Sequence, residues 1–335
     1  MNRRAGFLVA ICALALALTV GCGDRAPAES SATIEPQTEE AAAPTKRPER
    51  PTQRIEIESH DDVKALFEKL GYTPEAWQAG IREVPRMYLT NVPRRWGKKT
   101  SKEITVLTKK RVFFRVLAPL VLRSNELILR ERTRAETLAS EIRAGKQLSA
   151  EDRQWLQELA VYYKVIDSAE AELDSAELDE LLVRVDVVPV SLALAQGAEE
   201  SGWGTSRFAG EGNALFGQWT WDEKAMVPEQ QRRALGNYGI AAFETPLQSV
   251  LAYAQNLNTH RAYADLRAKR AEMRSNGQVP TGRTLAATLT SYSERGEAYV
   301  KTLYEIMDVN RLDAADEAHL GDGPNILLIP VGEGI

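Results

Sequence analysis

The chain has 335 residues, a net charge of −5 and a hydrophobic content of 44%. A mildly acidic chain is a poor candidate for nucleic-acid binding, and a chain of this length can bury a substantial core. Both cysteines, Cys12 and Cys22, lie near the N-terminus, which excludes a disulfide framework for the rest of the chain. His60, His260 and His319 are scattered without metal-ligand spacing, so we expect no metal and no other cofactor.

The first residues have the layout of a secretory signal. Arg3 and Arg4 precede an apolar run over residues 5–20, and the small residues of Gly-Cys-Gly follow it. A short basic start, a short apolar run and a small-residue end are typical of a cleaved signal, and the run is too short for a membrane-spanning helix. The sequence therefore predicts a signal peptide over residues 1–21.

The Gly-Cys pair at 21–22 resembles the end of the lipobox of bacterial lipoproteins. In that class Cys22 would be lipidated and would become the mature N-terminus. Thr19 departs from the pattern, which usually has Leu or Val there, and a plain cleaved signal is the alternative. Asp24 resembles the inner-membrane retention signal of enterobacterial lipoproteins. We therefore expect a periplasmic protein that a lipid on Cys22 anchors to a membrane, with the inner membrane favoured.

Residues 22–54 are expected to form the lipidated N-terminus and a disordered tether. Residues 24–53 contain five prolines and no aromatic residue. A segment of this composition cannot bury enough apolar surface to offset the entropy of ordering it. Such a tether would let a folded domain act at a distance from the membrane.

From residue 55 the pattern becomes helical, and residues 55–185 are predicted to form a helical N-terminal extension. Residues 60–71 start with acids and end in glycine, as helices commonly do. The longest apolar-periodic stretch, residues 109–142, contains Pro119, which should kink or split a helix. None of these segments carries a recognisable chemical motif, so we interpret the extension as a scaffold.

Two short strands are predicted over residues 215–243, joined by a long loop, because both are rich in aromatic and β-branched residues. Helical patterns return over residues 245–310. Residues 313–335 are expected to form a C-terminal tail, in which "NILLIPV" (325–331) could dock as an edge strand or remain mobile.

Ahead of these strands, a buried helix is predicted to deliver a carboxylate. The stretch "VSLALAQGAEE", residues 190–200, is apolar or small nearly all round. Pro189 suits its start, and Gly202 suits a left-handed cap at its end. Glu199 and Glu200 lie about 100° apart on such a helix, so only one can face a pocket. The negative helix end and the aromatic residues beyond it would both raise the pKa of that carboxyl, as a general acid requires.

The residues around this helix end resemble the glucosaminidase domain of peptidoglycan hydrolases, in particular its Bax-like branch. The blocks that carry the resemblance are "AEESGWG" (198–204), "NALFG" (213–217), "NLNTH" (256–260) and "SYSERGEAY" (291–299), with "KKRVFFRVLAPLV" (109–121) upstream. The resemblance covers roughly residues 100–312. It implies a lysozyme-like fold, mainly α-helical with a small β-lobe, over residues 186–312, with a cleft between the helical part and the lobe.

The resemblance also implies residue roles. Glu200 matches the catalytic acid, and Tyr292 matches the tyrosine of a loop close to the cleavage point. The cleft-shaping, substrate-binding positions are matched by Trp203, Asn213 and Phe216. Trp219 is a further candidate for stacking on a sugar, although core packing explains a tryptophan on a strand equally well. Glu199 departs from the family, which usually has an apolar residue there, and we expect it to point outward to solvent.

Glycoside hydrolysis generally needs a second carboxylate, as base or nucleophile, across the bond from the acid. The resemblance places it in the β-lobe, where the candidates are Asp222, Glu223, Glu229 and Glu244. We favour Glu223. The N-acetyl group of the sugar can also act as the nucleophile, in which case Glu200 and Tyr292 would suffice.

The resemblance therefore predicts a glycoside hydrolase, an endo-β-N-acetylglucosaminidase that hydrolyses the glycan strands of bacterial peptidoglycan. A lytic transglycosylase, which shares the fold and the single glutamate, is one alternative. A non-catalytic, peptidoglycan-binding scaffold lipoprotein is another. Glycan strands and a membrane are the predicted partners.

Overall fold

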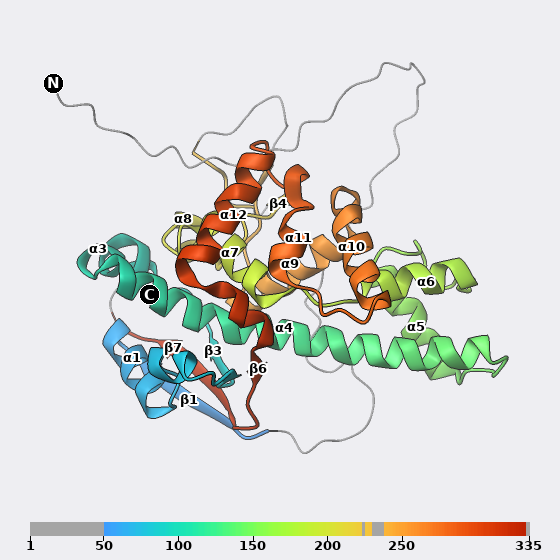
Figure 1. Ribbon diagram of the computed structural model, residues 1–335, viewed down its shortest axis with the longest axis horizontal. Helices are drawn as coiled ribbons and strands as arrows, with labels where there is room; N and C mark the ends of the chain where they lie inside the picture. Colours follow the sequence, from blue (N-terminus) through green and yellow to red (C-terminus); the bar gives the residue numbers. More distant parts are fainter. Residues whose placement is uncertain (1–49, 223–224, 230–237, 333–335) are drawn as a thin grey trace.

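A long helix, α4 (Val106–Arg143), runs through the molecule (Figure 1). The computed structural model describes residues 50–222, 225–229 and 238–332. α4 starts at Thr105, whose hydroxyl accepts a hydrogen bond from the amide of Thr108. It continues through Pro119, so the helix is not split there. Residues 117–122 are all buried, and their packing compensates for the backbone hydrogen bond that proline cannot make.

Shorter helices lie on either side of α4 in the sequence. Those before it are α1 (His60–Lys69), α2 (Pro74–Gln78), the π-helical turn η1 (Trp96–Thr100) and α3 (Ser101–Glu103). Those after it are α5 (Ala150–Tyr162), α6 (Ser175–Arg184), α7 (Val190–Ser201), α8 (Arg207–Gly212), α9 (Pro246–Thr259), α10 (Ala264–Ser275), α11 (Gly282–Ala286) and α12 (Glu297–Asn310). The 3-10 turns are η3 (Arg261–Tyr263), η4 (Leu289–Ser291) and η5 (Leu312–Glu317). The helix-rich composition confirms the predicted class, mainly α with small β elements.

The strands of the described chain form small sheets. In the largest, β7 (Asn325–Pro330) lies between β1 (Thr52–Ile57) and β3 (Met87–Leu89), and both pairings are parallel. Two further pairs are β2 (Glu83–Val84) with β6 (His319–Leu320), and β4 (Trp219–Thr220) with β5 (Gly239–Ile240).

The C-terminal segment is built into the fold and is not a tail. β7 has a hydrogen-bonded neighbour on each side, so it is a central strand and not the expected edge strand. Its partner β1 begins at Thr52, inside the segment expected to be a tether, and the predicted helical extension contains β2 and β3. The first and last described strands thus share one sheet, which lies below α4 in Figure 1, whereas α7, α11 and α12 lie above α4.

Arg86 fastens this sheet region to α4. Its two terminal nitrogens donate to the two carboxylate oxygens of Glu126 at 2.9 and 2.8 Å, and its Nε donates to the carbonyl of Gly321 at 2.8 Å. Burial by itself would raise the pKa of Glu126, but the hydrogen bonds from Arg86 and Arg123 lower it to about 2. The pair therefore remains charged across the neutral range.

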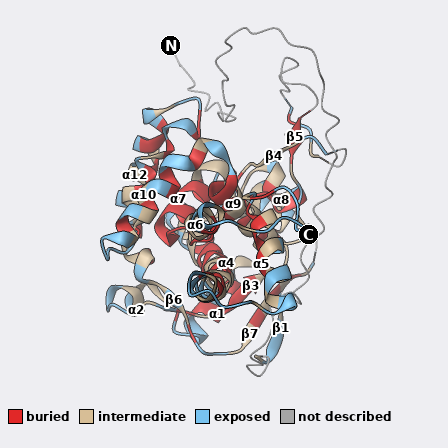
Figure 2. Cartoon of the chain, turned by 90° about the vertical axis from the view of Figure 1, so that its right-hand side faces the viewer, coloured by how far each residue is buried: buried red, intermediate tan, exposed pale blue. Residues whose placement is uncertain are grey.

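α7 is the most enclosed helix of the site region. Residues 190–198 are all buried, as the red ribbon of α7 in Figure 2 shows, which confirms the predicted buried helix. Gly197 allows α7 to approach α4 closely, because a Cβ there would lie 2.7 Å from Cδ2 of Leu117. The close packing fixes the direction in which α7 projects its C-terminal end.

Candidate active site

The C-terminal end of α7 places Glu200 at the edge of the core. The helix ends at Ser201, and Gly202 follows in the predicted left-handed conformation, with φ of 57°. Ser201 Oγ accepts a hydrogen bond from the amide of Gly204 at 2.8 Å, and the amide of Trp203 donates to the carbonyl of Ala198 at 2.9 Å. These bonds close the helix end and hold the backbone that carries Glu200.

A relay of three buried polar side chains, Tyr253, Gln196 and Tyr299, ends on one oxygen of Glu200. The Tyr253 hydroxyl donates to Gln196 Oε1 at 2.6 Å, and Gln196 Nε2 donates to the Tyr299 hydroxyl oxygen at 2.9 Å. The Tyr299 hydroxyl in turn donates to Glu200 Oε1 at 2.8 Å. An amide nitrogen can only donate, and an amide oxygen or a carboxylate can only accept, so the direction of each hydrogen bond in this relay is fixed. Burial, with a smaller effect of the Glu200 charge, raises the pKa of Tyr253 and of Tyr299 well above the ordinary value, so both remain donors at neutral pH.

The other oxygen of Glu200 lies on the side of Gly217. A Cβ built on Gly217 would be 3.9 Å from Glu200 Oε2, and Gly217 has a φ of +59°. A side chain at this position would be strained and would narrow the approach to the carboxyl. Glycine therefore keeps the backbone beside Oε2 without a side chain.

Tyr292, the second predicted catalytic residue, lies beside the same relay. Its ring stacks on Tyr299 with centroids 5.3 Å apart and an interplanar angle of 7°, and its centroid is 5.5 Å from that of Tyr263. Glu200 and Tyr292 thus share Tyr299 as a neighbour, Glu200 through the hydroxyl and Tyr292 through the ring. The structure brings these two predicted residues together although they are far apart in the sequence.

Glu199 is held by an ion pair and does not simply point into solvent as expected. Its Oε1 accepts a hydrogen bond from Arg295 at 2.6 Å, and its side chain is 28% exposed. Arg295 belongs to the loop that follows Tyr292 and also donates to Thr302 Oγ1. The Glu199 carboxylate therefore binds the loop, and the Tyr299 hydroxyl is left to Glu200.

Asn213, predicted to contact substrate, is occupied by the fold. It is buried, ends α8 in a left-handed conformation with φ of 53°, and accepts a hydrogen bond from the amide of Val92 at 2.8 Å. Both hydrogens of its amide group are used, since Nδ2 donates to the carbonyls of Phe243 and Glu244 at 3.0 Å each. Its side chain therefore joins three segments behind the site and has no donor left for a sugar.

Phe216 and Trp203 also pack into the protein. Phe216 is 2% exposed and stacks on Tyr253, with centroids 3.9 Å apart, so it supports the relay from behind. The Trp203 ring contacts Phe113 and Phe114 of α4, at 5.9 and 5.1 Å between centroids. These contacts give both aromatic side chains a packing role, and Phe216 is too buried to contact a sugar as expected, whereas Trp203 remains partly exposed.

The β4–β5 pair forms the expected small lobe. Trp219 on β4 is partly exposed and stacks on Tyr238, with centroids 4.3 Å apart. Glu223, the favoured second carboxylate, lies outside the described residues. The alternative carboxylates Asp222, Glu229 and Glu244 are exposed. Glu244 takes part in the cap of α9, where its amide donates to Gln248 Oε1 at 2.9 Å.

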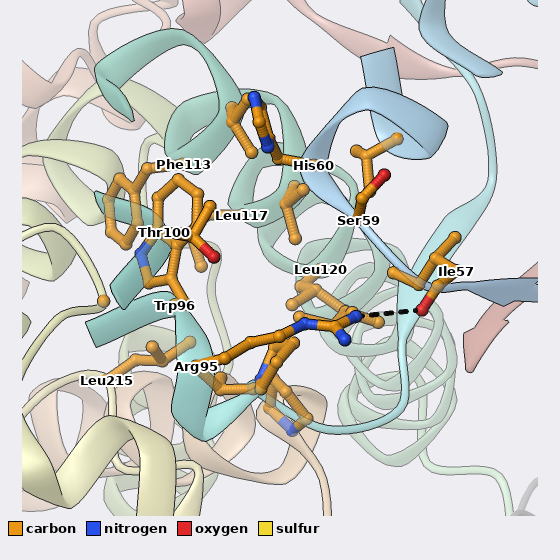
Figure 3. A pocket seen from close by; sticks show the side chains of 18 residues that line it. Ile57, Ser59, His60, Arg95, Trp96, Thr100, Phe113, Leu117, Leu120 and Leu215 are labelled. Atoms are coloured by element: carbon orange, nitrogen blue, oxygen red, sulfur yellow. Dashed lines mark hydrogen bonds between the residues drawn. The ribbon is translucent and has the colours of Figure 1, made fainter. Parts of the chain in front are cut away.

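An apolar cavity of about 90 Å³ lies elsewhere, between the N-terminal segments and α4. Figure 3 shows Trp96, Phe113 and Leu117 on one side of it and Ile57 on another, with Arg95 donating to the Ile57 carbonyl at 3.3 Å. No carboxylate lines this cavity, and Glu200 is not part of it. Among the described residues there is also no cluster of His, Cys, Asp and Glu that could hold a metal ion.

Sequence reasoning missed the residues that orient Glu200. Gln196 is a polar residue in an otherwise apolar helix, one turn before Glu200, which was a usable signal. Tyr299 stands in the "SYSERGEAY" block, but its contact with Glu200 depends on the packing of α12 against α7. Tyr253 gave no signal, because a buried tyrosine on an amphipathic helix is indistinguishable from ordinary core.

Comparisons with known proteins agree with this geometry. The family model Glucosaminidase, described as mannosyl-glycoprotein endo-beta-N-acetylglucosaminidase, matches residues 176–312. The chain is 35% identical over 208 residues to Protein bax of Escherichia coli (strain K12), and the aligned region covers 62% of this chain and 72% of that protein. The comparison with solved structures gave no significant match. The region matched by the family model contains α7, the relay and Tyr292.

Proposed function

Because the chain belongs to the Bax-like glucosaminidase-domain family, we propose that it is an endo-β-N-acetylglucosaminidase that hydrolyses glycan strands of bacterial peptidoglycan, with Glu200 as general acid. The observation that carries the proposal is the hydrogen bond of 2.8 Å from Tyr299 to Glu200 Oε1 at the end of a buried helix. A carboxyl group that is oriented by a buried relay beside a glycine is suited to proton transfer.

The relay assigns different tasks to the two oxygens of Glu200. Oε1 accepts the Tyr299 hydrogen bond, so the proton of the neutral acid belongs on Oε2, which lies on the side of Gly217. In the proposed reaction this proton moves to the glycosidic oxygen as the bond from that oxygen to the anomeric carbon breaks. The anomeric carbon then forms a bond with a water whose proton passes to Glu223, or with the N-acetyl oxygen of the same sugar, giving a cyclic oxazolinium ion that water opens in a second step. Tyr292 would act near the cleaved bond.

We also propose that the protein is periplasmic and is anchored to a membrane through lipidated Cys22. The basis is the N-terminal sequence, since residues 1–49 lie outside the described structure. Across the part of the chain that the structure describes, no helix is both long and apolar enough to cross a membrane. After a high-salt wash, which releases proteins held by charge alone, loss of membrane fractionation in a Cys22→Ala variant would support the anchor, and unchanged fractionation would contradict it.

The test of the activity is digestion of purified peptidoglycan with mass spectrometry of the released fragments. The chain from residue 23 to residue 335 is compared with its Glu200→Gln variant and with Glu305→Gln, an exposed control on α12. We expect new reducing N-acetylglucosamine ends from the parent and the control, and at least about 100-fold less product from Glu200→Gln.

Other products would overturn the proposal in distinct ways. Anhydro-sugar ends would identify a lytic transglycosylase. Absence of product from all three proteins, with the protein still sedimenting with the glycan, would identify a binding protein that keeps a hydrolase fold. Equal product from Glu200→Gln and the parent would remove Glu200 from the role of general acid.

A further inference from the structure

The end of the molecule formed by η1, α3 and the first turns of α4 is densely cationic. Residues 94–111, here called the cationic tip, contain eight lysines and arginines and one acid, although the whole chain has a net charge of −5. Lys98, Lys99, Lys102 and Arg111 are exposed. In Figure 1 the tip is the end of α4 beside α3, away from α5 and α6.

Among the described residues, four lysines outside the tip are paired with a carboxylate and two, Lys69 and Lys164, are not. Lys64, Lys146, Lys269 and Lys301 each lie within 4.0 Å of a carboxylate. Within the described ranges, Lys98, Lys99 and Lys102 form no such pair. The one acid of the tip, Glu103, is exposed and binds none of them. The positive charges of these three lysines are therefore available to an anionic partner outside the protein.

Two exposed aliphatic residues lie within the cationic segment, between Lys102 and Lys109 in the sequence. Val106 is 64% exposed and Leu107 is 56% exposed, on the first turn of α4. Exposed aliphatic residues ringed by lysine are typical of surfaces that lie in the headgroup region of an anionic membrane, where charge attracts and apolar side chains insert. A purely ionic partner would gain nothing from Val106 and Leu107.

The tip packs on the turn that follows α7, the helix that carries Glu200. Trp96 Nε1 donates to the carbonyl of Trp203 at 3.0 Å, and Lys110 Nζ lies 4.6 Å from the centroid of the Trp203 ring. A Cβ on Gly97 would come within 2.4 Å of the carbonyl oxygen of Thr205, so η1 packs directly on the turn after α7. Trp203 follows Glu200 by three residues. A surface that binds the tip therefore also fixes the orientation of Glu200.

We propose that the cationic tip docks on the anionic phospholipid surface of a membrane, with Val106 and Leu107 inserted among the headgroups. Docking would hold the candidate active site around Glu200 in a fixed orientation relative to that membrane surface. The interaction goes beyond glycan hydrolysis and uses neither Cys22 nor Glu200, so it stands or fails independently of both.

The test is sedimentation with vesicles of phosphatidylcholine alone or mixed equally with phosphatidylglycerol. The protein is the chain from residue 23 onward, so that no acyl chain contributes, and it retains every residue of the fold described above, which spans residues 50–332. We expect binding to the anionic vesicles alone, weakening as salt is raised. The triple variant Lys98→Glu, Lys99→Glu, Lys102→Glu should bind at least about 100-fold more weakly.

The apolar contribution is tested separately. Val106→Ser with Leu107→Ser should weaken vesicle binding about tenfold, whereas Val279→Ser with Val309→Ser, which removes two equally exposed valines, should leave it unchanged. A parallel triple reversal of Lys64, Lys269 and Lys301 controls for net charge. Unfolding curves verify that the variants are folded.

Three results would overturn the proposal. One is failure of the parent to bind anionic vesicles, and another is equal weakening of binding by both lysine triples, which would reduce the effect to net charge. Binding that is unaffected by the Val106 and Leu107 substitutions would mean that the tip recognises an anionic polymer by charge, and not a lipid surface.

Discussion

Arg295 and Glu199 form an ion pair of 2.6 Å that ties the loop after Tyr292 to the end of α7. Both side chains are partly exposed, at 36% and 28%, so the pair contributes little to global stability. Its consequence is local, because it joins the loop of one predicted catalytic residue to the helix of the other.

Arg295→Ala should therefore separate activity from stability. We expect the free energy of unfolding to change by less than about 1 kcal/mol, whereas kcat on peptidoglycan falls about tenfold because the Tyr292 loop loses its attachment. Urea unfolding and initial-rate kinetics measure the two quantities. The double variant Glu199→Arg with Arg295→Glu should restore much of the rate, and an unchanged kcat in Arg295→Ala would contradict the proposed role of the pair.

Tyr299→Phe should impair Glu200 while keeping the ring that stacks on Tyr292. It removes the hydrogen bond to Oε1, and loss of a bond to a charged group costs about 1.5–3 kcal/mol, or roughly 10- to 100-fold in kcat/KM. A donor to the carboxylate favours the ionised form, so its removal should move the alkaline limb of the pH–rate profile to higher pH. Tyr304→Phe on the same helix, which removes a bond of 3.3 Å to the Arg283 carbonyl, is the matched control and should leave the profile in place.

Asn213→Ala should destabilise the protein by about 3 kcal/mol, because one buried and two partly buried backbone groups lose their partner and alanine is unfavourable at a φ of 53°. The exposed Asn276, at the end of α10, provides the control, for which we expect a change within about 0.5 kcal/mol. Denaturant unfolding measures the change in the free energy of unfolding for both variants. A stable Asn213→Ala protein with a raised KM would return Asn213 to the substrate-binding role that the sequence suggested.

The pair between Arg86 and Glu126 predicts an acid-sensitive attachment of the sheet to α4. The pKa of Glu126 is lowered from 4.5 to about 2 in the folded protein, so its contribution is complete above about pH 4.5 and is lost as the pH falls toward 2. Glu126→Gln should cost about 2 kcal/mol at pH 7 and should flatten the decline of stability over this pH interval. Thermal unfolding from pH 7 to pH 2 tests this, with the partly exposed Glu141→Gln as control. A parallel decline in both variants would refute it.

The sequence by itself determined the elements whose signals are local. The all-apolar run from Val190 and the glycine at position 202 predicted α7 and its left-handed cap, and both are present. The motif blocks around Glu200 and Tyr292 indicated the family that the comparisons confirm.

Only the tertiary structure decided what those residues contact. β7 is a central strand because it pairs with β1 on one side and β3 on the other. Both partners lie more than 200 residues away in the sequence, so no local pattern around β7 predicts them. Asn213 and Phe216 turned from expected cleft residues into internal supports, because their partners come from other segments. The relay to Glu200 is formed by side chains of α7, α9 and α12. Their contacts depend on how these helices pack against one another, which residue types and their spacing along the sequence do not reveal.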